Sequence, residues 1–349
     1  MAVLDRRVAH EQFASTTRGL RREMPPMVLF EKAKRLGIWN PADIDFSQDV
    51  KDWHSLTDDQ RDYVLYLTSQ FQAGEEAVTL DLLPLINVIA REGRIEEEMF
   101  LTTFLWEEAK HLDFFNRFLT AIDAPVDLNE YHNPCYSRVF YEILPERLLA
   151  LQEDPSRENM VRAATTYNLA IEGIMAETGY YLWYSIMDAK NIFPGAKQGI
   201  RNIQLDESRH IAYGVFLISR LMAEDQSLWH IVEEVMQEML EAAQTMTTQA
   251  LEKYETHPFG FDPTDVTNFS AAQCKKRLAR IEKARGRSLE EIYKVTNLII
   301  EEGDRRIEEI EEQFNEGLLT QTERHSQIVK TWAEIKDRVT KLAKEKLPK

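Results

Sequence analysis

The sequence predicts an all-α protein, a helix bundle in which four helices carry metal ligands and accessory helices surround them. Strand signals are absent, because no stretch sustains an apolar–polar alternation and no Asn-Gly or Asp-Gly pair marks a hairpin turn. Apolar residues recur instead with the period of an α-helix over long segments. The third observation is a Glu-x-x-His motif that occurs twice and places a carboxylate and an imidazole on one helix face.

The two motifs are Glu108 with His111 and Glu207 with His210. On a helix, residues three apart meet, so each pair can bind one cation. A single copy carries little weight, because roughly one is expected by chance at this Glu and His content and a solvated ion pair explains it equally well.

An earlier glutamate makes the repeat specific. Glu75 lies 33 residues before Glu108, and Glu172 lies 35 residues before Glu207, each inside an apolar helical pattern. The chain thus repeats an inward Glu on one helix followed by Glu-x-x-His on the next. Four Glu and two His on four helices are the ligand set of a carboxylate-bridged dinuclear bundle.

The elements follow from helix start and stop signals. Thr57 and Ser156 are expected N-caps, and Gly37 and Gly93 are expected helix ends. We expect an extended segment at 38–56, a loop at 123–137 and a turn at 191–195. The expected helices cover residues 27–36, 58–92, 94–122, 138–152, 157–190, 196–222 and 226–255, followed by a short basic stretch at 268–285.

Three regions follow from these elements. Residues 1–25 are polar and Arg-rich and are expected to form a flexible arm. Residues 26–285 form the domain that holds both metal-ligand repeats. Residues 286–349 change to a charged pattern without catalytic spacing, which predicts an accessory helical hairpin that turns at Gly317.

Composition excludes several functions. The 349 residues carry a net charge of −17, which argues against binding to nucleic acid or to anionic membrane surfaces. No signal peptide opens the chain and no apolar run is long enough to span a bilayer. Cys135 and Cys274 show no metal or redox spacing. We therefore expect a cytoplasmic protein without membrane insertion.

Cation binding follows from the apolar surroundings of the ligands, because burying four carboxylates and two imidazoles without counter-charge is prohibitive. Oxygen donors with some imidazole suit Fe and Mn. One metal is expected at Glu75, Glu108 and His111, with Glu108 as the better candidate for a bridge. The other is expected at Glu172, Glu207 and His210.

Two further groups of residues belong to the predicted site. Asp206 directly precedes Glu207 and can orient His111, although a surface position explains it as well. Ala176 and Gly179 share the helical face of Glu172, and Gly173 adds a small residue to the same helix. These small side chains predict either a ligand pocket or close helix packing. Phe115, one turn after His111, is also expected to face inward.

At these residues the chain resembles the ribonucleotide reductase small-subunit superfamily, and most closely its ligand-binding oxidases with a mixed Mn/Fe cofactor. The resemblance covers roughly residues 25–285 and includes Trp39, Asp45-Phe46-Ser47 and Trp53. It implies a ferritin-like bundle and a homodimer. Standard reductase subunits carry a radical tyrosine where this chain has Phe115 and need an aromatic C-terminal tail. No aromatic residue follows Trp332.

The resemblance implies further site residues. Val78 and Tyr167 match the positions that the oxidases join by an ether bond. Ala176 stands where reductases have a bulky aromatic residue, which opens a tunnel for a long-chain fatty acid near Tyr180. The implied cofactor is one Mn and one Fe, with di-iron as the alternative. The implied reaction is a two-electron oxidation of a C–H bond, with O2 as co-substrate.

Other functions fit part of the pattern. One is a tyrosine-less reductase small subunit, which would bind a large catalytic subunit. Another is an acyl desaturase-like oxygenase with a similar ligand set. Iron storage is the non-enzymatic alternative, and the long C-terminal extension argues against it. A purely structural bundle would bind no stoichiometric metal.

Overall fold

The computed structural model describes residues 12–125, 127–251, 254, 256–294 and 296–297, and the chain divides into two compact units, 1–286 and 287–349. The first unit is all-α, as predicted, and contains no strand among its described residues. The predicted hairpin at 286–349 lies almost entirely outside the described residues and stays a prediction.

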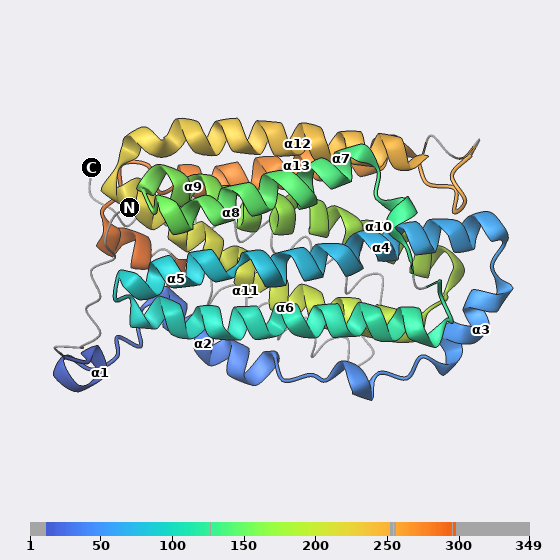
Figure 1. Ribbon diagram of the computed structural model, residues 1–349, viewed down its shortest axis with the longest axis horizontal. Coiled ribbons are helices and arrows are strands. Elements are labelled where there is room, and N and C mark those ends of the chain that lie inside the picture. Colours follow the sequence, from blue (N-terminus) through green and yellow to red (C-terminus); the bar gives the residue numbers. More distant parts are fainter. Residues whose placement is uncertain (1–11, 126, 252–253, 255, 295, 298–349) are drawn as a thin grey trace, which may run out of the picture. The chain divides into compact units, whose positions relative to one another are not determined.

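The metal-ligand motifs lie on four packed segments. Helix α4 (Asp58–Asp81) packs against α6 (Ile95–Ala121), and the two run side by side in Figure 1. The π-helical segment η4 (Thr165–Ala176) packs against α11 (Pro194–Glu224), which also contacts α6. These four segments enclose the centre of the unit.

Accessory helices cover the four central segments. Helix α2 (Pro25–Leu36) packs on α6 and α11, and α12 (Trp229–Leu251) and α13 (Pro263–Glu282) pack on η4 and on each other. Helix α13 begins five residues before the expected basic stretch, because Asp262 caps it and Pro263 occupies its first turn. Further elements are α1 (Ala14–Thr17), η2 (Asn129–Tyr131), α7 (Pro134–Ser137), η3 (Arg138–Ile143), α8 (Leu144–Glu153) and η5 (Gln226–Leu228).

The predicted caps are confirmed. The Thr57 hydroxyl accepts the backbone N–H of Gln60, and the Gln60 side chain accepts the N–H of Thr57, which forms a capping box at the start of α4. At the start of α9 (Arg157–Ala164), the Ser156 hydroxyl accepts the backbone N–H of Asn159. Gly93 follows the helix that ends at Arg91 and has a positive φ of 69°, which glycine adopts without strain.

The prediction of a single helix over 58–92 is wrong. Helix α4 ends at Asp81, and α5 (Leu83–Arg91) begins after Leu82. Pro84 lies at the start of α5, where it lacks an N–H to donate and its ring clashes with the carbonyl four residues earlier. Proline therefore interrupts a hydrophobic pattern that otherwise continues.

The prediction of a single α-helix over 157–190 is also wrong. This stretch consists of α9, η4 and α10 (Glu177–Lys190) in succession, and the central η4 is wound as a π-helix. Hydrogen bonds that span five residues bring Tyr167 and Glu172 to nearly the same face. Helix α11 approaches this segment closely, since a Cβ on Gly214 would lie 2.2 Å from the Cβ of Asn168.

The extended segment expected at 38–56 contains two short helices, η1 (Pro41–Asp43) and α3 (Ser47–Ser55). The Asn40 side chain accepts the backbone N–H of Ala42, and the Asp45 side chain accepts that of Ser47, at the starts of these two helices. Asp49 of α3 is buried and accepts the N–H groups of Gly195 and Ala196 at 2.9 and 2.7 Å. Helix α3 therefore fixes the first turn of α11.

The N-terminal arm is attached over its described part, which corrects the prediction of a loose segment. Arg18 donates to both carboxylate oxygens of Glu96, and the backbone N–H of Arg21 donates to the same side chain at 3.1 Å. Glu96 is fully buried. Burial opposes its ionisation, but the bonds from Arg18 and Arg21 outweigh this and lower its pKa to about 2. No helix among the described residues is long and apolar enough to cross a membrane.

We expect the Glu96→Gln variant of the metal-free protein to lose about 1–3 kcal/mol of unfolding free energy at pH 7, because charged hydrogen bonds to a buried group are lost. The carboxyl pKa is depressed in the folded state, so the wild-type advantage is complete above pH ~4.3 and shrinks as pH falls toward 2. Urea unfolding at several pH values measures both the loss of unfolding free energy at pH 7 and its decrease toward pH 2.

Glu98→Gln is the matched control. Glu98 lies in the same first turn of α6 and shares its interaction with the helix dipole, but it is partly exposed. A loss in Glu98→Gln as large as that in Glu96→Gln would show that the arm contributes nothing.

Candidate metal centre

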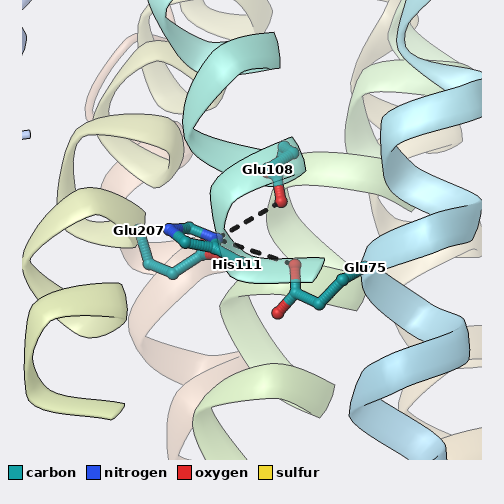
Figure 2. A group of neighbouring side chains, drawn as sticks. All are labelled: Glu75, Glu108, His111 and Glu207. Carbon is teal, nitrogen blue, oxygen red and sulfur yellow. Dashed lines mark ion pairs between the residues drawn. The ribbon is translucent and has the colours of Figure 1, made fainter. Parts of the chain in front are cut away.

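The fold brings all six predicted ligands together in its interior. Glu75 on α4, Glu108 and His111 on α6, and Glu207 on α11 form one group whose donor atoms lie within 4.8 Å of one another. Glu108, Glu172, Glu207 and His210 form a second group of the same kind. Figure 2 shows the first group, with Glu75 approaching from the helix opposite His111. Each of the six side chains is buried.

Glu108 and Glu207 belong to both groups. The sequence singled out Glu108 as a bridge and assigned Glu207 to one metal alone, whereas the geometry places both carboxylates between the two positions. Glu75 and Glu172 each belong to one group only. The arrangement therefore has two shared and two terminal carboxylates, with one histidine on each side.

The imidazoles face this centre through the same ring atom. His111 Nδ1 lies 3.6 Å from Glu75 and from Glu108 and 3.5 Å from Glu207. His210 Nδ1 lies 3.1 Å from Glu108, 3.5 Å from Glu207 and 3.9 Å from Glu172. These spacings place nitrogen and oxygen donors around two common points.

Several of the donor atoms are buried without a hydrogen-bond partner. They are Nδ1 of both histidines and one carboxylate oxygen each of Glu108, Glu172 and Glu207. Buried polar atoms that lack a partner carry a large desolvation penalty. Because these atoms converge on the same small volume and are oxygen and imidazole nitrogen, the residues fit a pair of divalent transition-metal ions.

Electrostatics lead to the same conclusion. Burial raises the pKa of Glu75 to about 8 and raises that of Glu172 well above its usual range. Burial alone would lower the histidine pKa values, but the surrounding carboxylates raise both well above the usual value. Burial opposes ionisation of Glu108, yet both histidines hold its pKa well below its usual range. Protons on the carboxyl and imidazole groups thus offset the negative charge of the buried acids, and metal binding must displace these protons.

The outer nitrogen of each histidine contacts a further carboxylate. His111 Nε2 lies 3.2 Å from Asp206, as the sequence predicted, and His210 Nε2 lies 2.9 Å from Glu107. Arg209 donates from one nitrogen to both carboxylates. Sequence reasoning missed Glu107, although the signal was available: an acid directly precedes the Glu of both motifs.

The residues of the predicted cross-link lie beside the centre. The hydroxyl of Tyr167 is 3.3 Å from the backbone oxygen of Val78 and 3.5 Å from Glu108. Tyr167 is fully buried, and burial raises its pKa well above the usual value. A neutral phenol therefore lies against both Val78 and a shared carboxylate.

A cavity of about 120 Å³ opens beside the four glutamates. Glu75, Glu108, Glu172 and Glu207 line one part of it, and its other walls are mostly apolar and aromatic. Those walls come from α4, α7, η3, η4, α10 and α12 and include Phe71, Val78, Phe140, Ile171, Met175, Leu182 and Met246.

Of the predicted pocket residues, Ala176 and Gly179 line this cavity. Gly173 does not, because it faces Arg277, whose Nε donates to its carbonyl at 3.2 Å. Phe115 and Tyr180 also lie outside the lining. Both stack on Phe71, with ring centroids 4.9 and 5.1 Å away, and so they support a wall of the cavity from behind.

Comparisons with known proteins agree with this geometry. The family model of the ribonucleotide reductase small chain matches residues 25–296. Among solved structures, a valine-to-leucine variant of an R2-like ligand-binding oxidase with aerobically reconstituted Mn/Fe cofactor is 40% identical, with a TM-score of 0.74. A glycine-to-leucine variant with anaerobically reconstituted Mn/Fe cofactor is 40% identical, with a TM-score of 0.75. A tyrosine-to-phenylalanine variant with aerobically reconstituted Mn/Fe cofactor is 39% identical, with a TM-score of 0.72.

Each alignment covers 78% of this chain and 98% of the solved chain. The match includes the helices that carry both metal-ligand groups, and the predicted ferritin-like architecture is confirmed. The chain belongs to the ribonucleotide reductase small-chain family and is similar, over almost the whole of their length, to R2-like ligand-binding oxidases.

Proposed function

We propose that this protein is a dinuclear Mn/Fe oxidase that uses O2 for a two-electron oxidation of a C–H bond and binds a long-chain fatty acid or similar lipid beside the metals. The observation that supports the metal pair most directly is the convergence of buried, unpartnered histidine nitrogens and carboxylate oxygens. Similarity at 40% identity to oxidases with a Mn/Fe cofactor supports the choice of metals.

Each metal position has its own residues. Glu75 and His111 hold one, Glu172 and His210 hold the other, and Glu108 and Glu207 are shared. When bound, the metal pair supplies the redox chemistry with O2. The protein fixes the donors on four packed segments, orients the histidines through Asp206 and Glu107, and keeps the centre away from bulk water.

The proposed internal product is an ether bond between Tyr167 and Val78. Forming it removes the phenolic hydrogen and a valine Cβ hydrogen, and O2 accepts the two electrons. Burial keeps Tyr167 protonated until the reaction, and its hydroxyl already lies against Val78 and Glu108. This proximity of the phenolic oxygen to Val78 supports the proposed bond.

The cavity gives the proposed lipid a place beside the metals. Its walls are apolar over most of their area and carry the glutamates at one part only. An amphipathic ligand fits this distribution if its polar head faces the metals and its chain lies along Ala176, Gly179 and Leu182. Phe115 lacks the hydroxyl needed for a stable radical at its position, which argues against a standard reductase subunit.

Elemental analysis of protein loaded with Mn(II) and Fe(II) is expected to find two metal ions per chain. Glu172→Ala removes a terminal ligand and should retain roughly one, whereas Glu108→Ala removes a shared ligand and should retain neither tightly. Glu98→Ala, on the same helix but outside the centre, is the control and should bind both. A wild-type protein without stoichiometric metal would favour a purely structural bundle.

The cross-link is tested by peptide mapping after aerobic loading with Mn and Fe. We expect the peptides that contain Val78 and Tyr167 to become joined, with a loss of two hydrogens. The Tyr167→Phe variant keeps the ring but lacks the oxygen, so its peptides should stay separate. Unjoined peptides in fully loaded wild type would refute the ether bond while leaving the metal site intact.

We expect a lipid to co-purify with the wild type and to be lost in the Ala176→Phe variant, because a ring at this position fills the cavity. Organic extraction followed by mass spectrometry measures the lipid, and elemental analysis shows whether metal binding persists. Ala176→Ser keeps a small side chain and should retain the ligand. Equal amounts of lipid in wild type, Ala176→Phe and Ala176→Ser would show that the lipid binds outside this cavity.

A further inference from the structure

The two metal positions have equivalent donors, but their surroundings differ. Each has one terminal glutamate, two shared glutamates and one histidine. Each histidine also has an outer carboxylate, Asp206 for His111 and Glu107 for His210. The difference lies in what these two outer carboxylates bind.

Asp206 receives several donors. One oxygen, Oδ2, lies 2.7 Å from Lys110 Nζ and 2.8 Å from Trp39 Nε1, and the same oxygen faces His111 Nε2 at 3.2 Å. Arg209 donates to the other oxygen. Asp206 is fully buried, so water does not weaken these contacts.

Glu107 has fewer donors. One of its oxygens lies 2.9 Å from His210 Nε2, and the other accepts from Arg209. Within the described part of the chain, no lysine or tryptophan donates to it. Arg209 donates to both carboxylates, and the charge of Lys110 also acts on Glu107. Of the two carboxylates, however, only Asp206 is in direct contact with Lys110 and Trp39, and this makes the two sides unequal.

This inequality changes the histidines as ligands. A carboxylate that accepts the outer N–H of a metal-binding histidine increases the electron donation of the inner nitrogen. Asp206 shares its charge with a lysine and an indole, so it increases the electron donation of its histidine less than Glu107 does. The distances agree with this, because His111 Nε2 lies 3.2 Å from Asp206 whereas His210 Nε2 lies 2.9 Å from Glu107. His111 is thus the weaker nitrogen donor.

A weaker nitrogen donor discriminates less between the two metals. Fe(II) lies above Mn(II) in the general order of affinities, and stronger nitrogen donation increases this preference. We propose that Lys110, acting through Asp206, is a positioning residue that lowers the Fe-over-Mn preference at the His111 position relative to the His210 position. This inference rests on the proposed Mn/Fe function.

Lys110 also has structural contacts that a test must separate from this role. Its ammonium donates to the carbonyl of Gly37 at 2.7 Å and lies over the rings of Trp39 and Trp106 at 4.5 and 4.6 Å. Lys110→Met removes the charge but keeps the apolar stem. Arg209 remains bound to Asp206, so this carboxylate keeps a cationic partner in the variant. Lys110→Arg keeps the charge.

The experiment loads wild type, Lys110→Met and Lys110→Arg with equal Mn(II) and Fe(II) in the absence of O2. Anomalous diffraction from crystals above each metal's absorption edge then gives the Fe:Mn ratio at each position. We expect the ratio at the His111 position to rise roughly tenfold in Lys110→Met. The His210 position is an internal control and should not change, and Lys110→Arg should match wild type.

Three results would overturn the inference: an unchanged ratio in Lys110→Met, an equal change at both positions, or the same change in Lys110→Arg. Trp39→Phe removes the indole donor to the same Asp206 oxygen without altering charge and is expected to raise the ratio at the His111 position by a smaller factor. It replaces Lys110→Met if that variant does not fold. A wild-type protein that fails to bind two metals would refute the proposed function itself, which separates the two failures.

Discussion

The structure depends on the burial of four carboxylates and two imidazoles at a single point between α4, α6, η4 and α11. Ionised carboxylates in such an interior repel one another, and without cations they must hold protons, as the raised pKa values of Glu75 and Glu172 indicate. A pair of divalent metals removes this conflict. Folding and metal binding are therefore expected to be coupled, because the bundle brings the ligands together and the metals neutralise them.

Much of the surrounding structure serves to hold the ligands in place. Asp49 of α3 binds the first N–H groups of α11, which carries Glu207 and His210. The π-helical winding of η4 directs Tyr167 and Glu172 toward the same region. Around the histidines, Arg209 joins Asp206 to Glu107, so the two outer carboxylates belong to one buried network. A change in any of these contacts is transmitted to the donors without touching them directly.

The same arrangement separates the proposed oxidase from other uses of this ligand set. The glutamates line one part of a mainly apolar cavity, which supports the proposal that an organic ligand binds beside the metals. The hydroxyl of Tyr167 lies 3.3 Å from the backbone oxygen of Val78, and this proximity supports the proposed ether bond. The stacked rings of Phe71, Phe115 and Tyr180 close one side and help to exclude water.

The sequence by itself determined the helical class, the capping signals at Thr57 and Ser156, and the six residues that converge. These are local or periodic properties: helix period, cap chemistry and i, i+3 spacing are all written along the chain. The tertiary structure alone decided that Glu207 is shared like Glu108, that Glu107 contacts His210, and that Gly173 faces Arg277 instead of the cavity. It also decided the π winding of η4. The break at Pro84 has a local cause, because proline has no N–H to donate and interrupts the apolar pattern. The physical reason is that sharing, orientation and cavity lining depend on distances between segments far apart in the chain, and helical periodicity does not encode those distances.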